Sequence, residues 1–209
     1  MLPPDEIEQM LASHRLYLDT EYHEGHRANF SSADLTRRDF SGLNLRGIKM
    51  DRTLLQGADF TAADLREANL IGAMLQEARF DRADLSRARL SGANLVSASL
   101  ENACLVRAEM EFAVMASAVL QGACLLQADM SGVLLDLGAL PRADLRDANL
   151  RGAGLRDAQL DAADLRGARL GGAFLVPHCA VPICTARICV RRSWTAPICP
   201  MPISTAPKA

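Results

Sequence analysis

Histidine, which serves as a general base and as a metal ligand, is scarce in this 209-residue chain. Three of its four histidines, His14, His23 and His26, lie near the N-terminus, where imidazole nitrogens could bind a metal ion. No histidine lies between Arg27 and Pro177, so the long central segment lacks the commonest general base. We favour an ordinary loop over a metal site, and predict no catalytic residues, cofactor or metal.

Cysteine is the second residue type with chemical potential. Cys104 and Cys124 lie in the central segment, and four of the six cysteines follow Pro177, close to the end of the chain. All of them stand at regular intervals, which metal sites and disulfide frameworks seldom show. The spacing of these residues therefore reflects how the chain is built.

A five-residue period organises the chain. From Phe30 to Leu175 every fifth residue is Leu, Phe or Met, thirty times in succession, and in twenty-four cases an Ala stands two residues earlier. A five-residue period matches neither the 3.6-residue period of a helix nor the two-residue period of a strand. The chain must therefore turn after each unit, and internal repeats of this kind decide the fold.

Units such as Ala63-Asp64-Leu65-Arg66-Glu67 and Ala148-Asn149-Leu150-Arg151-Gly152 closely resemble the pentapeptide repeat family, whose pattern is Ala-(Asp/Asn)-Leu-X-X. The resemblance covers about 148 of the 209 residues. It implies an all-β fold, a right-handed quadrilateral parallel β-helix in which four five-residue units form one square coil. The central Leu or Phe and the small residue before it would point inward.

The sequence itself supports a coil of four units. Phe40, Phe60 and Phe80 recur at every fourth unit and would stack on one inner face, about 4.8 Å from coil to coil. Cys104 and Cys124 are also four units apart and would stack on the outside, where their separation would permit a disulfide. In a reducing cytosol, we expect two inert thiols.

Most acidic residues of the repeat occupy the outward position just before the central residue. We expect these carboxylates to keep the rod in solution and to bind turn backbone, since Asp and Asn favour such bonds. The residues concerned are Asp34, Asp39, Asp59, Asp64, Asp84, Asp129, Asp144 and Asp164.

The pattern weakens in two places. Arg38, Leu43, Ile48 and Thr53 replace the small residue in four consecutive units, which predicts a distorted or wider coil. Farther along, Val133 and Gly138 replace it, and Pro141 follows; because proline cannot donate to a ladder, we expect it at a corner.

Three segments follow from these patterns. Residues 1–27 predict a short amphipathic helix, up to about Asp19, and a loop that caps the solenoid. Residues 28–175 form the repeat of about seven coils. Residues 176–209 form an irregular tail rich in Pro and Cys.

The tail keeps the five-residue spacing, but with other residue types. Cys179, Cys184, Cys189, Cys199 and Ser204 continue it. Read one base late, codons for Ala-Asp-Leu give Pro-Ile-Cys, Arg-Ile-Cys or Pro-Ile-Ser, and all three occur here. We therefore interpret the tail as a frameshift product of further repeats, in preference to a genuine metal or redox tail. The last coil would then lack an evolved cap, and an uncovered β edge favours association.

On one outer face the usual Asp or Asn becomes apolar. Contiguous exposed apolar surface often marks a partner site, although drift, or cover by the N-terminal helix or a dimer mate, would explain it too. The candidate partner surface consists of Leu54, Met74, Phe112, Val114, Leu134, Leu137 and Phe174.

Charge and topology limit the remaining function classes. The net charge is −2 with both signs interspersed, so no direct nucleic-acid binding is expected. No basic region followed by an apolar run begins the chain, and no run of about eighteen apolar residues occurs, which predicts a cytoplasmic protein without a membrane span.

We predict a non-enzymatic scaffold or protein-interaction module, able to dimerise through the apolar face or the uncapped C-terminal coil. The alternative comes from relatives that protect DNA gyrase from quinolones by resembling duplex DNA. A nearly neutral rod, with Arg46, Arg66, Arg146 and Arg166 recurring on one face, argues against that alternative.

Overall fold

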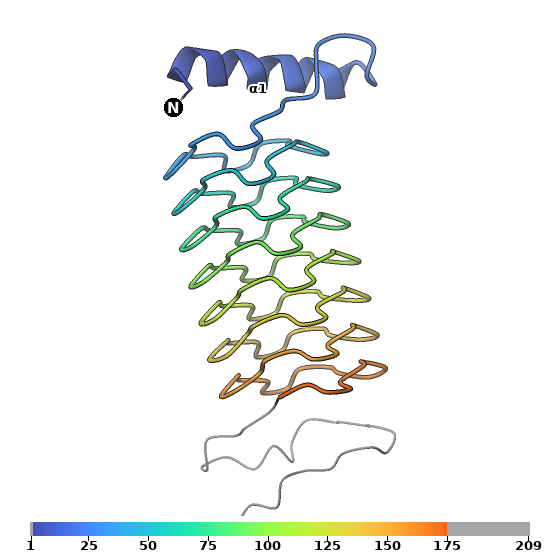
Figure 1. Ribbon diagram of the computed structural model, residues 1–209. Coiled ribbons are helices and arrows are strands. Elements are labelled where there is room, and N and C mark those ends of the chain that lie inside the picture. Colours follow the sequence, from blue (N-terminus) through green and yellow to red (C-terminus); the bar gives the residue numbers. More distant parts are fainter. Residues whose placement is uncertain (1, 175–209) are drawn as a thin grey trace, which may run out of the picture.

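The computed structural model describes residues 2–174, which form one helix and a stack of rectangular coils (Figure 1). Helix α1 spans Pro4–Asp19 and lies across the N-terminal end of the stack. The proposed tail, its frameshift origin and the exposed end of the last coil lie outside the described residues.

Successive coils are joined by parallel pairing between outward residues that are four units apart. Asp39 pairs with Asp59 and Asp59 with Arg79, and the same step recurs from Asn29 to Phe174. The Phe40 N–H donates to the Asp59 carbonyl at 2.7 Å, and the Asp59 N–H donates to the Arg38 carbonyl at 2.9 Å. In residues 2–174 the β-structure consists of single bridging residues between turns, so β-pairing is present without long strands.

A tight turn closes each five-residue unit. The Ala63 N–H donates to the Phe60 carbonyl at 3.0 Å, and Ala62 between them has a φ of 57°. A positive φ at the third residue of a four-residue turn is typical of type II geometry, which glycine adopts most readily. Gly42, with a φ of 66°, fills the equivalent position one coil earlier. Four such turns return the chain to its starting side.

The interior is filled by the central and small residues of each unit. The rings of Phe40 and Phe60 stack with centroids 5.0 Å apart, and those of Phe60 and Phe80 with centroids 4.9 Å apart. This confirms the predicted phenylalanine stack. Nearly all central residues from Phe30 to Leu165 are buried, so side chains occupy the space inside the coils.

Outward Asp and Asn side chains bind the following turn, as expected. Asp84 Oδ1 accepts the Ser86 N–H at 2.9 Å, and Asn94 Oδ1 accepts the Val96 N–H at 3.2 Å. The same bond occurs at Asp34, Asp39, Asp59, Asp64, Asp129, Asp144 and Asp164. These residues therefore serve the scaffold.

The distortion expected at the first weak spot is absent, because ladder and turns continue unbroken. Ile48 and Thr53 are buried, and Thr53 Oγ1 donates to the Phe30 carbonyl at 2.8 Å. Leu43 stays exposed, and Arg38 reaches out to Glu8 of α1 at 2.7 Å. The coil keeps its register because each of these side chains either turns outward or finds a partner inside.

Pro141 lies at a turn, as predicted. It occupies the position whose N–H elsewhere binds an outward Asp or Asn, and the outward residue here is Ala139, which has no acceptor. The missing proline N–H therefore costs no ladder bond, and the Pro141 carbonyl still accepts the Gly122 N–H at 2.9 Å.

Helix α1 is held against the first coil by its apolar side. Ile7 is buried, and Leu2, Met10 and Leu11 pack against the core. His14 is also buried, and its Nδ1 accepts the Ala28 N–H at 3.3 Å. The helix thereby covers apolar residues of the first coil.

Candidate functional site

The apolar candidates stack in one outward column. Parallel bridges connect Leu54 to Met74 and Val114 to Leu134 directly, with one intervening residue, Asn94, between the two pairs. We call this side of the rod the apolar face. Its outward column runs Asp34, Leu54, Met74, Asn94, Val114, Leu134, Gly154 and Phe174.

Exposure differs along this column. Leu134 and Phe174 are 51% and 60% exposed, Leu54 is 39% exposed, and Met74 and Val114 are half-buried. The structure thus brings five of the seven candidates into one line that reaches from the second coil to the last described residue.

The other two candidates flank the column at the corners. Phe112 and Leu137 occupy positive-φ turn positions with φ of 57° and 61°, and are 72% and 62% exposed. The Phe112 ring lies over Gly132 of the next coil, because a Cβ added at Gly132 would fall 2.6 Å from Phe112 Cδ1. Phe112 is therefore a ridge beside the column.

Apolar residues in this column forgo a bond that the scaffold uses elsewhere. Asn94 in the same column still binds the Val96 N–H, whereas Leu134 offers no acceptor to the Asp136 N–H. A typical hydrogen bond contributes about 1 kcal/mol. The repeated replacement on one face therefore gives up scaffold stabilisation at several levels of the rod.

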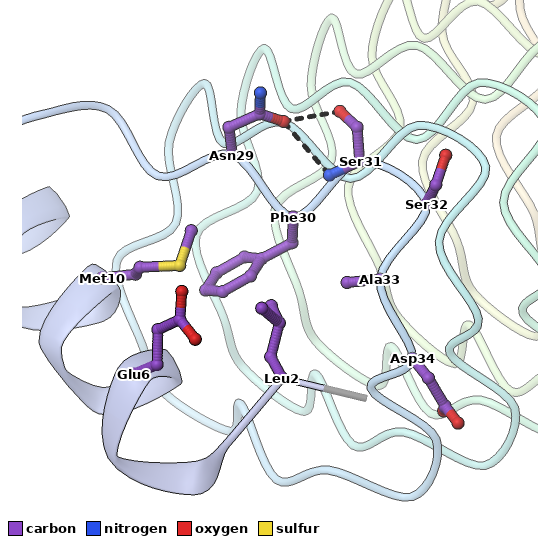
Figure 2. A pocket seen from close by; sticks show the side chains of 9 residues that line it. All are labelled: Leu2, Glu6, Met10, Asn29, Phe30, Ser31, Ser32, Ala33 and Asp34. Atoms are coloured by element: carbon purple, nitrogen blue, oxygen red, sulfur yellow. Dashed lines mark hydrogen bonds between the residues drawn. The ribbon is translucent and has the colours of Figure 1, made fainter.

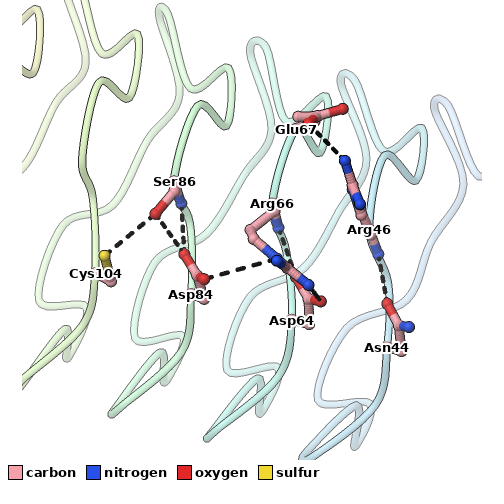
Figure 3. A network of polar contacts seen from close by, with 8 residues as sticks. All are labelled: Asn44, Arg46, Asp64, Arg66, Glu67, Asp84, Ser86 and Cys104. Atoms are coloured by element: carbon pink, nitrogen blue, oxygen red, sulfur yellow. Dashed lines mark hydrogen bonds and ion pairs between the residues drawn. The ribbon is translucent and has the colours of Figure 1, made fainter.

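The opposite side, two units farther along each coil, is built from charge pairs (Figure 3). Arg66 Nε donates to Asp64 Oδ1 at 2.8 Å and lies 3.7 Å from Asp84 Oδ2. Arg146 repeats this arrangement, with Nε donating to Asp144 Oδ1 at 2.8 Å. We call this side the Asp–Arg face; its outward column runs Asn44, Asp64, Asp84, Cys104, Cys124, Asp144 and Asp164.

Sequence reasoning placed these arginines on one face but missed their partners. The signal was present as Asp-Leu-Arg, which occurs at 64–66, 144–146 and 164–166. Since outward side chains two residues apart lie on the same face, each arginine can pair with its own aspartate. Hydrogen bonds from Arg146 hold the pKa of Asp144 below its usual value, and those from Arg166 do the same for the pKa of Asp164.

The two described cysteines interrupt the Asp–Arg face. Cys104 and Cys124 pair through a parallel β-bridge between adjacent coils, as the predicted stacking requires. Both thiols are free. Cys104 Sγ lies 3.2 Å from Ser86 Oγ, and Cys124 Sγ lies 4.0 Å from Asp144 Oδ2. Neither has a basic side chain in hydrogen-bonding contact that would activate the thiol.

The N-terminal histidines do not converge. His14 is buried under α1, where burial and then the charge of Arg27 lower its pKa. His23 Nδ1 lies 2.8 Å from the Thr20 carbonyl at the exposed loop. Among residues 2–174 no group of three or more His, Cys, Asp or Glu side chains is placed to hold a metal ion.

One open hollow lies between α1 and the first coil (Figure 2). It measures about 500 Å³ and is lined by Leu2, Glu6 and Met10 from the N-terminal segment and by residues 29–34 from the coil. Asn29 Oδ1 is engaged by the Ser31 N–H and hydroxyl at 3.1 and 2.6 Å. The hollow is lined by two carboxylates, Glu6 and Asp34, and by the side chains of Ser31 and Ser32.

Across the described residues, no helix has the length and apolar character needed to cross a membrane.

Comparison with known families returns one match. The family model for pentapeptide repeats matches in eight copies, over residues 28–66, 53–92, 93–132 and 140–176. A search of curated proteins finds no match.

Among solved structures, the chain is similar to HetL, a pentapeptide repeat protein involved in regulating heterocyst differentiation in the cyanobacterium Nostoc sp. strain PCC 7120. The identity is 26%, over 76% of this chain and 92% of that chain, with a TM-score of 0.33. A pentapeptide repeat protein of the Arabidopsis thaliana thylakoid lumen is 28% identical, over 58% of this chain and 71% of that chain, with a TM-score of 0.35. Trypsin-treated QnrB1, a plasmid-mediated fluoroquinolone resistance protein, is 18% identical over 68% of this chain and 89% of that chain, with a TM-score of 0.44.

Proposed function

Because this chain belongs to the pentapeptide repeat family, we propose that it is a non-enzymatic module that binds another protein through its apolar face. The scaffold for this surface is the right-handed quadrilateral β-helix that the family resemblance implies. Cytoplasmic localisation remains a prediction from the sequence.

The rod is suited to presenting a surface. Each coil is bonded to the next on every side, and the interior is filled by Leu, Phe, Met and Ala side chains. An interior packed in this way has no room for a substrate and resists deformation. The function therefore lies on the outer faces.

The observation that carries the proposal is the clustering of outward apolar residues on one face. Leu54, Met74, Val114, Leu134 and Phe174 share a column, whereas the columns on the neighbouring sides are mostly polar or charged. Random drift would distribute such residues over all four sides. Exposed apolar surface arranged in one strip is typical of an interaction site.

The test compares matched substitutions on opposite faces. Leu134→Glu places a charge in the middle of the apolar column, and Leu126→Glu makes the same chemical change on the Asp–Arg face, where Leu126 is half-buried. We expect Leu134→Glu to abolish partner capture and any self-association, and Leu126→Glu to preserve both. Unchanged capture and unchanged oligomeric state for Leu134→Glu would refute the proposal.

Action on DNA gyrase is the alternative function, and the charge pairs disfavour it. A surface that imitates duplex DNA needs uncompensated negative charge, whereas Arg66, Arg146 and Arg166 neutralise the aspartates of the Asp–Arg face. A gyrase supercoiling assay with and without a quinolone tests this alternative, and we expect the protein to change neither result.

A further inference from the structure

The Asp–Arg face changes its chemistry over two consecutive coils. In its outward column, the usual Asp or Asn is replaced by Cys104 and Cys124. Two residues farther on, where the other levels of this face have arginine or serine, the chain has Val106 and Leu126. All four side chains are half-buried. A pair of thiols therefore interrupts the charged face, beside two apolar side chains that limit the access of water to the sulfur atoms.

The β-helix fixes the distance between the two cysteines. The Cys124 N–H donates to the Ala103 carbonyl at 2.9 Å, and the Leu105 N–H donates to the Cys124 carbonyl at 2.7 Å. Side chains of adjacent coils follow the same translation, since the rings of Phe60 and Phe80 are nearly parallel with centroids 4.9 Å apart. In matching rotamers, the two sulfur atoms are therefore about 4.8 Å apart.

This spacing suits a bridging metal ion better than a disulfide. Although the Cα spacing of adjacent coils is within the disulfide range, the Cβ atoms of a disulfide are only about 3.5–4.5 Å apart. Closing it would pull two hydrogen-bonded coils together. Two thiolates in line with one ion, with metal–sulfur bonds of about 2.3 Å, place their sulfur atoms about 4.6 Å apart. The ladder thus presents the two sulfur atoms near the separation that linear coordination requires.

The polar contacts of both thiols are weak and leave the sulfur atoms available. Cys104 Sγ lies 3.2 Å from Ser86 Oγ, whose hydroxyl donates to Asp84 at 2.6 Å, so the thiol is the donor (Figure 3). The Cys124 thiol donates to Asp144 Oδ2 at 4.0 Å. Because a soft cation displaces thiol protons as it binds, such a site needs no activating base.

Arg146 supplies the positive charge that such a complex requires. Two thiolates around one monovalent cation have one net negative charge, and the Asp144 carboxylate is nearby. Arg146 Nη2 lies 2.7 Å from Asp144 Oδ2. The hydrogen bond to Asp144 and, to a lesser degree, the Cys124 sulfur raise the pKa of Arg146. The guanidinium therefore lies within electrostatic range of the thiol and can offset the added negative charge.

We propose that Cys104 and Cys124 form a two-coordinate site for a soft monovalent cation, with Cu(I) as the biological candidate. Each thiol loses its proton as the ion binds, and no electron is transferred. Thiolates select Cu(I) over the hard cations Mg²⁺ and Ca²⁺, and two ligands are half of the four that Zn²⁺ normally has. The site does not depend on the apolar face.

The experiment uses the full chain in a background without the tail cysteines, because those thiols would bind Cu(I) as well. The background substitutions are Cys179→Ser, Cys184→Ser, Cys189→Ser and Cys199→Ser. Anaerobic titration against a coloured Cu(I) chelator should give one ion per chain, and Ag(I) should bind in the same ratio. X-ray absorption of the copper complex should show two sulfur neighbours.

Removal of either thiol should abolish tight binding. Loss of a group that only supports a metal ligand lowers metal affinity about 10–100-fold, so Cys104→Ser or Cys124→Ser should lower it at least about 100-fold. Circular dichroism should show the same fold for both variants, because both side chains lie on the outside of the rod.

The spacing is tested by two variants that share one substitution. Cys104→Ser with Asp144→Cys keeps two thiols one coil apart, at positions 124 and 144, and should retain tight binding. Cys124→Ser with Asp144→Cys leaves two thiols two coils apart, about 9.6 Å, which one ion cannot bridge in a line. This variant should bind Cu(I) at least about 100-fold more weakly. Since both variants lack the Asp144 carboxylate, their difference reports the spacing of the thiols.

Three results would overturn the site. The first is equal Cu(I) affinity of the two spacing variants. The second is Zn²⁺ binding as tight as that of Cu(I), which would indicate a larger set of ligands. The third is a Cys104–Cys124 disulfide that forms with oxidised glutathione in a chain that binds no Cu(I), which would show that the coils yield to the shorter sulfur distance.

Discussion

The apolar face and the Asp–Arg face share one backbone and use its outward position in opposite ways. On the Asp–Arg face, Asp64 and Asp144 bind their own turns and a neighbouring arginine, so the bonding capacity of the side chains is used within the rod. On the apolar face, Leu54 and Leu134 bind no turn and are partly exposed. One side of the rod therefore uses its outward side chains to stabilise the coil, whereas the other side leaves apolar side chains exposed.

A substitution in the core should lower the free energy of unfolding of the whole rod, because the same core supports both faces. Phe60 lies between the rings of Phe40 and Phe80 and is completely buried. Phe60→Ala should lower the free energy of unfolding by about 3–5 kcal/mol, since it removes a large buried ring and leaves a cavity. Urea unfolding followed by circular dichroism measures this loss. A loss below about 1 kcal/mol would contradict the packed stack.

Substitution of an aspartate on the Asp–Arg face should lower stability, because its carboxylate binds both its own turn and an arginine. Asp144→Ala removes the acceptor for the Arg146 N–H at 3.2 Å and for the Arg146 side chain. Because the carboxylate is partly exposed, we expect a loss of only about 1–2 kcal/mol. Asp144→Asn is the matched control, since its amide oxygen can still accept the backbone N–H and should retain part of the stability.

Lowering the pH should remove the stabilisation that the charged Asp144 carboxylate provides, without a mutation. The Arg146 hydrogen bond lowers the pKa of Asp144, so the folded state favours the charged carboxylate. This stabilisation is present above the ordinary pKa of aspartate, about 3.9, and is lost as the pH falls through the lowered folded value. Unfolding curves between about pH 5 and about pH 2 should therefore converge for the wild type and Asp144→Asn.

The sequence was sufficient for the coil but less so for the surfaces. The five-residue period places each central residue inside because the ladder admits only one register, and it predicts the Phe40–Phe60–Phe80 stack. The same period places Leu54, Met74 and Leu134 in one column. It cannot give the exposure of a turn residue such as Phe112, whose ring position depends on the glycine of the next coil.

The five-residue pattern also gave wrong or incomplete expectations where a long side chain extends away from its position in the repeat. Arg38 was expected to distort its coil, but a long side chain can extend outward to Glu8 of α1. The Arg66–Asp64 pair was missed because the residues after the central position were regarded as variable. Both cases depend on side-chain length and on neighbours in space, which a periodic pattern does not encode.

The capped end should respond to pH independently of the two faces. His14 is buried with a lowered pKa, and its Nδ1 accepts the Ala28 N–H, which requires the neutral ring. The stabilisation of α1 docking is present above the ordinary histidine pKa of about 6.5 and is lost as the pH falls towards the lowered value. Hydrogen exchange of α1 amides, expressed as protection factors relative to the intrinsic rate at each pH, should show lower protection at about pH 5 than at about pH 7, with the protection factors of the central coils unchanged. Equal protection at both values would mean that the ring titrates without undocking the helix.

The smallest expected effect is the most informative about the two faces. Leu134→Asn gives the apolar face the side chain that the scaffold normally has there, and its amide oxygen can accept the Asp136 N–H as Asn94 accepts the Val96 N–H at 3.2 Å. In dilute solution, where the chain is monomeric, we expect the free energy of unfolding to rise by about 0.5 kcal/mol, because a turn bond is gained and only a partly exposed leucine is lost. Self-association should weaken in the same variant. A more stable rod with weaker self-association would show that leucine at position 134 lowers the stability of the fold and favours the contact. A less stable rod would mean that Leu134 contributes to packing within the rod. The two faces would then differ less than their chemistry suggests.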